Sequence, residues 1–294
     1  MMSEEVENAD ELAAAGTVCI VCDSTEFKER WPGLIQCQRC DFITADMSKY
    51  GDEDFEKLYG HDYFHGDEYH DYIAEKAITQ KSFKLRMRKL DRFLDPNRHR
   101  SVLEIGSAYG FFLDFVRDRF SKATGTDVAV EGVQYAQAQG LDVRLGDLTR
   151  MDLDDNYDVV CLWDTIEHLA HPEDHLEIIS KRTQPGALIT VTTGDIGSPL
   201  ARVRGRKWRL IHPPTHLHYF SEKTLSKFLE RYGFRVVHSS YCGGYRSLEF
   251  AANFILNVQW NKPRLYRAVQ KTGLLKFAPY MNMGDIRYII AERV

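Results

Sequence analysis

The sequence has no apolar run that approaches the 18 or so residues needed to cross a membrane. It also lacks a strong charge of one sign, because 38 Lys and Arg face 43 Asp and Glu, for a net charge of −5. This balance argues against a surface built wholly to hold nucleic acid, and we expect no nucleic-acid partner. The first sixteen residues lack the basic and then apolar pattern of a secretory signal. We therefore expect residues 1–16 to be a disordered tail on a cytoplasmic protein.

Cysteine is sparse, but four of the six cysteines are grouped in two pairs. Cys19 and Cys22 form the first pair, and Cys37 and Cys40 form the second, with fourteen residues between the pairs. Two such turns supply four thiolates, which suits the tetrahedral preference of Zn²⁺. Two disulfides are the alternative, although cytosolic thiols stay reduced. We predict a ribbon-like module over residues 17–46, closed around a structural zinc that does no chemistry.

Residues 47–97 differ in character from the cysteine module and are predicted to form a connector. Between residues 50 and 72 the chain is crowded with Tyr, Phe, His and Asp. The next run, residues 73–94, is amphipathic, and we predict a long helix that ends before Pro96. We interpret the aromatic cluster as packing between two units, with a roof over a substrate pocket as the alternative.

From residue 98 to residue 294, apolar and β-branched segments alternate with helical ones. The first strand is predicted at Val102–Ile105, and the closing strand at Asp285–Val294. Alternation of this kind implies βαβ units with right-handed crossovers around a parallel sheet. We therefore predict a doubly wound α/β domain, in which ligands bind beyond the carboxyl ends of the strands.

The first crossover of this domain has the features of a ligand-binding turn. Gly106 and Gly110 bracket the turn, where backbone can approach a ligand closely. Asp127, twenty-one residues after Gly106, ends the second strand and is placed to accept hydrogen bonds from ribose hydroxyls. A helix N-cap is the alternative for Asp127, and it is compatible with ribose binding. The Gly-x-Gly-x-x-Gly spacing of dinucleotide sites is missing.

The stretch LEIGSAYGFFL resembles the first motif of class I S-adenosylmethionine-dependent methyltransferases, with Ala108 at the place of the middle glycine. The similarity continues through GTDVAVEGVQYA, VRLGDL, YDVVCLWDTIEHLAHPEDHL and QPGALITVTT, and it covers residues 101–193. It implies a Rossmann-like seven-stranded sheet whose last strand is antiparallel, with S-adenosylmethionine as the cofactor. The cofactor-binding residues that it implies are Glu104, Gly106, Ser107, Ala108, Gly110, Phe111, Asp127, Val128, Asp147, Leu148, Trp163 and Asp164.

The resemblance also assigns parts of the cofactor to these residues. Glu104 and the glycine loop hold the methionine end, Asp127 the ribose, and Asp147 with Leu148 the adenine. Asp164 lies near the sulfonium. Methyl transfer is an in-line displacement from a cationic sulfur, so an acidic site that positions the reactants suits the chemistry.

Three histidines follow the fifth strand in the stretch HPPTHLHYFS, which covers residues 212–221. A hydroxyl or carbon acceptor must lose a proton, which calls for a base. Sugar C-methyltransferases with an N-terminal zinc module carry a similar Glu-His-Leu-x-Tyr-Phe-Ser stretch whose histidine is the base. That match points to His216, although Thr215 replaces the glutamate. His218 and His168 are further candidates for catalysis, and a histidine that only caps the loop is the alternative.

Glu167 and His168 form a second constellation with Asp164. Ubiquinone-pathway O-methyltransferases have a similar Glu-x-x-Glu-His stretch that can hold a divalent metal, but Asp164 departs from it. We expect the Glu-His pair to stabilise the turn after the fourth strand. In the basic run before the histidines, Arg206 and Arg209 are predicted to bind a substrate phosphate together with His212, with a solvated surface as the alternative.

We therefore expect methyl transfer from S-adenosylmethionine to a small molecule, a sugar or a glycan, phosphate-bearing acceptors included. Two other functions were weighed. An RNA base methyltransferase is the first, since some ribosomal RNA enzymes also place a zinc ribbon before this domain. The residues from Trp163 to Ile166 lack the Asn/Asp-Pro-Pro-Tyr/Phe motif usual for exocyclic amines. A binding protein with a vestigial cofactor site is the second, and Gly106, Gly110 and Asp127 argue against it.

Overall fold

The computed structural model of the protein describes residues 17–49, 73–153, 156–252, 256, 262–273, 275 and 277–294. The tail predicted over residues 1–16 and the aromatic cluster at residues 50–72 lie outside these described residues. Among the helices of the described part, none is both long enough and apolar enough to cross a membrane.

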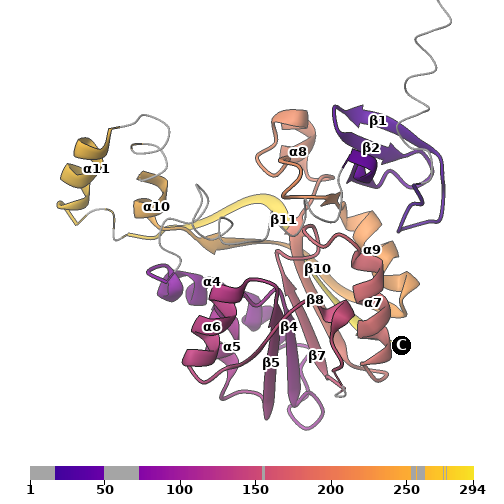
Figure 1. Ribbon diagram of the computed structural model, residues 1–294, viewed down its shortest axis with the longest axis horizontal. Helices are drawn as coiled ribbons and strands as arrows, with labels where there is room; N and C mark the ends of the chain where they lie inside the picture. The colour runs from indigo at the N-terminus through magenta and orange to yellow at the C-terminus, as the bar shows by residue number, and fades with distance from the viewer. Residues whose placement is uncertain are drawn as a thin grey trace, which may run out of the picture.

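A sheet of seven strands forms the centre of the main domain (Figure 1). Its strands lie in the order β10 (Phe234–Tyr245), β11 (Tyr280–Arg293), β8 (Leu188–Gly194), β7 (Val159–Trp163), β4 (Ser101–Ile105), β5 (Lys122–Asp127) and β6 (Asp142–Leu145). Strands β8, β7, β4, β5 and β6 pair in parallel, whereas β11 pairs antiparallel with β8 and with β10. The predicted doubly wound sheet with an antiparallel last strand is confirmed.

Helices cover both faces of this sheet because its central strands are apolar on both faces. In β4, Val102 packs in a core with helices α4 (Lys76–Leu90), α5 (Phe111–Val116) and α6 (Val130–Ala138). Its neighbours Leu103 and Ile105 belong to a second core with α7 (Pro172–Lys181) and α9 (Glu222–Arg231). The three layers place all the strand-to-helix loops of the parallel strands at one edge of the sheet.

The helix predicted over residues 73–94 is present but shorter, since α4 begins at Lys76 and ends at Leu90. Phe83, Met87 and Leu90 are its buried apolar residues, and they pack against the main sheet. Turns carry the chain from Asp91 to the first strand.

The cysteine region folds as a small antiparallel sheet that the main domain completes. Its strands β1 (Phe27–Trp31), β2 (Leu34–Cys37) and β3 (Ile43–Ala45) are followed by the 3-10 turn η1 (Met47–Lys49). The fourth strand, β9 (His218–Tyr219), pairs antiparallel with β3 and comes from the histidine stretch. The backbone N–H of Ala45 donates to the carbonyl of Leu217 at 2.7 Å, which adds a further bond at this junction.

The small sheet and the main domain share one hydrophobic core. Cys19, Cys37 and Phe42 lie in the same buried cluster as Phe220 and Phe228, the latter in α9. Figure 1 shows the small sheet beside α9 and α7. The N-terminal unit is therefore packed onto the domain, and does not hang from it by a linker alone.

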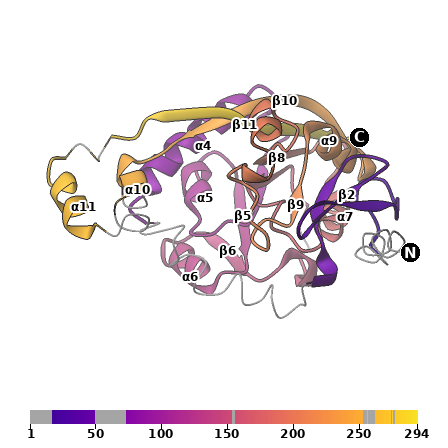
Figure 2. The same cartoon turned by 90° about the horizontal axis from the view of Figure 1, so that it is seen from above.

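The C-terminal elements depart most from expectation. Between β8 and β9 lie α8 (Pro199–Arg204) and the turn η3 (Gly205–Lys207), and between β10 and β11 lie α10 (Leu248–Ala252) and α11 (Pro263–Gln270). Helix α11 ends at Gln270, and the left-handed Gly273 follows it. Strand β11 begins at Tyr280, ahead of the closing strand predicted from Asp285, and β10 and β11 continue beyond the sheet toward α10 and α11 (Figure 2).

Candidate active site

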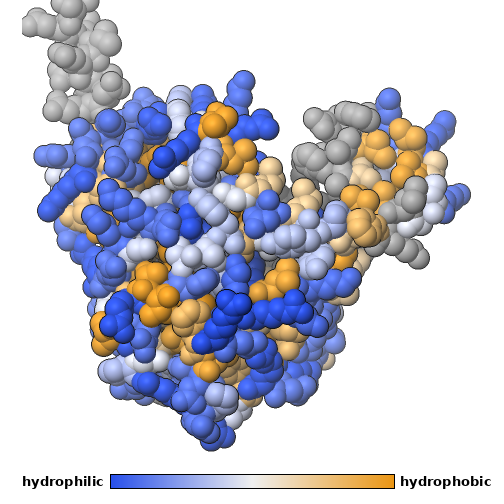
Figure 3. All heavy atoms as spheres, turned by 180° about the vertical axis from the view of Figure 1, so that it is seen from behind, coloured by the Kyte–Doolittle hydropathy of each residue, from blue (hydrophilic) through white to orange (hydrophobic). Residues whose placement is uncertain are grey.

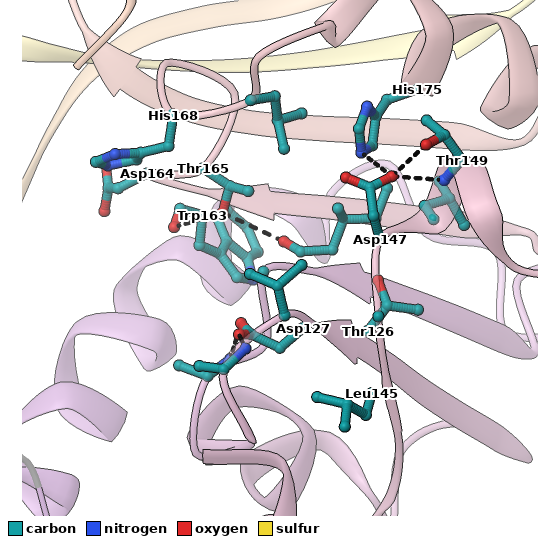
Figure 4. Close-up of a pocket in the computed structure, with 18 of the residues that line it drawn as sticks. Thr126, Asp127, Leu145, Asp147, Thr149, Trp163, Asp164, Thr165, His168 and His175 are labelled. Carbon is teal, nitrogen blue, oxygen red and sulfur yellow. Dashed lines mark hydrogen bonds and ion pairs between the residues drawn. The ribbon is translucent and has the colours of Figure 1, made fainter. Parts of the chain in front are cut away.

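A cavity of about 860 Å³ lies at the carboxyl ends of β4, β5, β6 and β7 (Figure 4). Parallel sheets bind ligands at this edge, and the volume lies in the range of small-molecule sites, about 300–1,000 Å³. Eight of the predicted cofactor-binding residues line the cavity: Gly106, Ala108, Asp127, Val128, Asp147, Leu148, Trp163 and Asp164. The other four, Glu104, Ser107, Gly110 and Phe111, are not among its lining residues.

The first crossover forms the tight turn that its glycines predict. Gly106 has φ +72° and Gly110 has φ +70°. Ala108 also adopts a left-handed conformation, with φ +45°, so the change from glycine keeps the turn. This conformation costs a residue with a Cβ about 1–2 kcal/mol.

Helix α6 presses closely against this turn. A Cβ added to Gly132 would lie 2.9 Å from the carbonyl carbon and oxygen of Ala108. Backbone atoms at that distance must move, so Gly132 keeps the helix close to the cofactor loop. The sequence reading did not single out Gly132, since a lone glycine in a helical segment carries no specific signal.

Asp127 is held in place by two backbone N–H groups, one from the first turn and one from the start of α6. Its Oδ2 accepts from the N–H of Ala108 at 2.7 Å, and its Oδ1 accepts from the N–H of Ala129 at 2.8 Å. Burial raises the pKa of Asp127, while the N–H donors of Ala129 and Ala108 work in the opposite direction. The carboxylate therefore ties the first turn to the start of α6 and keeps further acceptor capacity toward the cavity.

Glu104 is a buried acid without a hydrogen-bond partner for its Oε2. Burial raises its pKa well above the usual range, and the nearby negative charge of Asp127 raises it further. A cationic ligand group near this loop would stabilise the ionised form. The orphaned oxygen, the left-handed turn and the fixed Asp127 together fit S-adenosylmethionine, which carries an ammonium, a sulfonium and a ribose.

Asp147 forms a second fixed carboxylate at the opposite side of the cavity from Asp164 (Figure 4). Its Oδ1 accepts from the N–H of Thr149 at 2.7 Å and lies 3.3 Å from Nε2 of His175. Burial works to raise the pKa of Asp147, but the hydrogen bond and the charge of His175 outweigh it and lower the pKa. His175 also lines the cavity, and the sequence reading missed it.

Trp163 and Asp164 end β7 at the other side of the cavity. Asp164 has φ +53°, and its N–H donates to the carbonyl of Thr192 at 3.0 Å. Its Oδ2 accepts from Nη2 of Arg86 at 2.7 Å, and the Arg86 guanidinium also lies 5.3 Å from the centre of the Trp163 ring. Burial works to raise the pKa of Asp164, but the charge of Arg86 outweighs it, so the carboxylate stays ionised.

Arg86 belongs to a face of α4 that walls the cavity. Thr79, Ser82, Phe83 and Arg86 all line it, and they follow each other at helical spacing. The sequence predicted the helix but gave no sign of which side faced the cofactor loop. Arg246, just after β10, completes this wall with an exposed guanidinium.

The structure brings His168, His212 and His216 together. The rings of His168 and His216 have centroids 4.6 Å apart, and those of His212 and His216 are 4.0 Å apart. Nδ1 of His168 donates to the carbonyl of Thr215 at 2.8 Å, and Nδ1 of His216 donates to the carbonyl of Leu210 at 2.9 Å. Burial lowers the pKa of His168 to about 4 and that of His216 to about 2. Only His168 of the three lines the cavity.

His218 is placed for a structural role. Its Nε2 donates to the carbonyl of Leu169 at 2.9 Å, and its Nδ1 accepts from the hydroxyl of Thr44 at 3.1 Å. Burial lowers its pKa to about 4, which favours the neutral ring that these two bonds require. Both ring nitrogens of His218 are hydrogen-bonded, and His218 does not line the cavity. This geometry argues against the predicted catalytic role.

The predicted phosphate site is not part of this cavity. Arg206, Arg209 and His212 are absent from the lining. Arg209 donates from Nη2 to Oδ1 of the buried Asp285 at 2.9 Å. That ion pair crosses from the loop to β11, so it could not be foreseen from neighbouring residues. Substrate binding by Arg206 and Arg209 stays a prediction.

Two groups in the described residues are arranged so that they could hold a metal. The four Sγ atoms of Cys19, Cys22, Cys37 and Cys40 lie within 4.8 Å of one another, with two pairs at 3.6 Å. Tetrahedral zinc places its sulfurs about 3.8 Å apart, whereas a disulfide is about 2.05 Å long. The four cysteines are free thiols whose spacing fits a zinc site better than two disulfides.

Glu167, His168 and His216 are the second group, again with ligand atoms within 4.8 Å. Burial raises the pKa of Glu167 to about 8, and Asp164 adds to that effect. The backbone carbonyl of Glu167 accepts from the N–H of Leu217 at 2.8 Å, and Nδ1 of His168 donates to the carbonyl of Thr215 at 2.8 Å, so this turn is joined to the histidine stretch.

Comparisons with known proteins agree with this geometry. Residues 78–239, more than half of the chain, match the model of a family described as a methyltransferase domain. A SAM-dependent methyltransferase from Archaeoglobus fulgidus has 19% identity and a TM-score of 0.50, over 76% of this chain and 100% of its own. Magnesium protoporphyrin IX methyltransferase from Synechocystis, with bound SAH, has 13% identity and a TM-score of 0.50, over 83% and 100%.

A third structure, the complex of a methyltransferase activator, Trm112, from Haloferax volcanii, contains a chain with 16% identity and a TM-score of 0.51. It covers 74% of this chain and 92% of its own. At these identities the likeness concerns the fold. No curated protein matches the sequence significantly.

Proposed function

The chain belongs to the methyltransferase-domain family and is an S-adenosylmethionine-dependent methyltransferase, and on that premise we propose that its acceptor is a small molecule, sugar or glycan bound beside Arg86 and His168. The observation that carries this proposal is the lining of the cavity, which includes residues beyond those assigned to the cofactor. Thr79, Ser82 and Arg86 on α4, together with His168 and Arg246, are polar groups available to an acceptor.

When bound, S-adenosylmethionine supplies an electrophilic methyl group on a positive sulfur. Asp127 is the group that we assign to its ribose, because it lines the cavity and its two oxygens are held by the N–H groups of Ala108 and Ala129. Asp147 and Leu148 are assigned to the adenine side. Asp164, held ionised by Arg86, gives a negative environment at the sulfonium side.

His168 is the proposed base for the acceptor proton. It lines the cavity, whereas His216 stands behind it, so the role moves from His216 to its neighbour. With Nδ1 donating to Thr215, the basic lone pair of the neutral ring is on Nε2. The ring of His216 meets that of His168 edge-on and would orient it, and His212 packs against His216 in turn.

Arg246 suits an acceptor that carries a negative group. Arg246 is exposed and lines the cavity, whereas Arg206 and Arg209 do not line it. An anionic acceptor such as a phosphorylated sugar or lipid-linked glycan would find its charge partner there. We also propose that the four cysteines hold a structural zinc, which keeps β3 paired with β9 and so supports the histidine stretch.

Labelled S-adenosylmethionine incubated with pooled sugars, glycans and small molecules, read by mass spectrometry, tests the function. His168→Gln should lower kcat with little change in SAH affinity. Arg246→Ala should raise the acceptor KM about tenfold, for the loss of one charged hydrogen bond. Lys227→Ala, at an exposed position on α9 outside the cavity lining, is the matched control and should leave KM unchanged. Transfer to none of the pooled classes, or a rise in KM for Lys227→Ala alone, would contradict the proposed acceptor site.

A further inference from the structure

The extension of β10 and β11 beyond the sheet carries an arm that projects from the body of the protein (Figure 1). We call residues 246–283 the basic arm, and describe it from its placed residues, which include α10, α11 and the first part of β11. The N–H of Arg246 donates to the carbonyl of Pro279 at 3.2 Å, which joins the two sides of the arm at its base.

The basic arm is opposite in charge to the rest of the chain. It contains six Lys or Arg and one acidic residue, Glu249, whereas the whole chain has a net charge of −5. Glu249 is turned toward α11, where its Oε1 accepts from Gln270 at 2.6 Å and from the Tyr266 hydroxyl at 3.3 Å. The single negative side chain is therefore bonded within the arm, and the exposed basic side chains of its described part include Lys262, Arg264 and Arg267.

Apolar side chains are exposed among these charges. Phe277 is 66% exposed, and four others are about half exposed: Leu265, Tyr280, Met281 and Met283. Figure 3 shows hydrophobic and hydrophilic residues side by side over this projection. Tyr280 pairs with Tyr245 and Met281 with Gly244, so neighbouring side chains of β11 point to opposite faces of the ribbon. The exposed Tyr280 and Met281 of β11 therefore lie on different faces of the ribbon.

We propose that the basic arm binds the surface of an anionic lipid bilayer, with its cations at the headgroups and its exposed apolar side chains in the interface. Basic residues mixed with exposed Phe, Leu and Met are the composition of interfacial segments. A fluid interface takes apolar side chains from both faces of a ribbon, which a rigid protein surface does not. A second copy is disfavoured because two positive arms would repel each other.

The position of Arg246 links the arm to the cavity, because this residue lies at the base of the arm and lines the cavity. Resting on the proposed function, the inference narrows the acceptor class to an amphipathic molecule that is anchored in the bilayer and carries an anionic group. Such an acceptor would enter from the membrane side, past Arg246.

Vesicle flotation tests the proposal without any need for methyl transfer. The full chain is mixed with vesicles of phosphatidylcholine alone, or of phosphatidylcholine with phosphatidylglycerol. The wild type should float with the anionic vesicles, and salt should weaken binding. Arg264→Glu with Arg267→Glu, both exposed on α11, should lower partitioning at least about 30-fold. Lys223→Glu with Lys227→Glu, exposed on α9, is the matched control and should float like the wild type.

A second variant separates the apolar contribution from the charge. Phe277→Ser with Met281→Ser keeps every charge of the arm and should also weaken flotation. Equal SAH affinity in all variants shows that they are folded and that the cofactor site is intact. The proposal is overturned if the wild type stays with the soluble fraction, if both charge variants behave alike, or if sedimentation shows a dimer that α11 charge reversal dissociates. Binding only to an acidic protein would likewise overturn it.

Discussion

Thr44 of the N-terminal sheet and His218 of β9 are joined by a 3.1 Å hydrogen bond between Oγ1 and Nδ1. The two residues are 174 positions apart, and they also face each other in the β3–β9 pairing. Through this junction the cysteine turns, the small sheet and the histidine stretch form one structural unit. Any change that unfolds the cysteine turns should therefore alter the positions of His216 and His168.

Disruption of the proposed zinc site should unfold this junction before the main sheet. We expect Cys37→Ser to lower the free energy of unfolding by about 3 kcal/mol or more, because a closed thiolate site contributes its binding energy to folding. Hydrogen exchange should rise in β3 and β9 together, while β4 and β5 keep their protection. Cys242→Ser, a buried cysteine outside the group, is the control and should leave β3 and β9 protected. Unchanged exchange in β9 for Cys37→Ser would refute the coupling.

Gly132→Ala should damage the cofactor loop, although the same change inside a free helix stabilises by about 1 kcal/mol. The new Cβ would lie 2.9 Å from the carbonyl of Ala108 and push the turn toward the cavity. We expect weaker SAH binding, by about tenfold, together with lower stability. Gln134→Ala, on the same helix, serves as the control. A more stable Gly132→Ala protein with unchanged SAH affinity would show that the turn has room to move.

The Arg86–Asp164 pair should be needed for activity more than for folding. Arg86→Met leaves Asp164 without its cation, and since Asp164 is partly exposed we expect a cost of about 2 kcal/mol. Adding Asp164→Asn removes the stranded charge and should restore most of the stability, without restoring methyl transfer. Lys76, on α4 like Arg86, forms a partly exposed pair with Asp114 of α5, and Lys76→Met should cost less than about 1 kcal/mol. Full activity in the double variant would mean that the pair only supports the fold.

The Asp147–His175 pair should give stability that depends on pH. Because the pKa of Asp147 is lower in the folded protein than in the unfolded chain, Asp147 stabilises the fold above its unfolded pKa of about 4. This stabilisation is lost as the pH falls through the folded pKa. Burial works to lower the pKa of His175, but the hydrogen bond and the charge of Asp147 outweigh it, so the pKa is raised in the folded protein. The stability that His175 contributes is therefore complete below its unfolded pKa of about 6.5 and is lost as the pH rises through its folded pKa. Urea unfolding should therefore show the largest cost of His175→Gln at about pH 5. A cost that is flat from pH 4 to about pH 9 would contradict this pairing.

The alternation of strands and helices and the position of the cofactor loop could be predicted because each carries a local signal. Apolar runs marked the central strands, and Gly106, Gly110 and Asp127 marked the turn and the ribose side. Strand β9 gave no such signal, because two residues are too short to show a period and its partner Thr44 is far away in sequence. The role of Arg209 was hidden for the same reason, since its partner Asp285 lies 76 residues later.

The cavity wall formed by α4 was only partly predictable from the sequence. Thr79, Ser82 and Arg86 lie on one side of a correctly predicted helix. Their spacing reveals that side once the helix is known to face the cofactor loop, but the packing direction of a helix is a tertiary property. His175 was missed because a histidine in an amphipathic helix has no signature of its own.

Titration of SAH into the wild type and into Asp127→Asn by calorimetry tests most directly whether the first crossover and Asp127 form the cofactor site. The wild type should bind one SAH per chain. Asp127→Asn loses the charged acceptor and should bind at least about tenfold more weakly. Asp118→Asn, at an exposed position outside the cavity lining, should bind like the wild type. No binding by the wild type, or equal affinity in Asp127→Asn, would contradict the site.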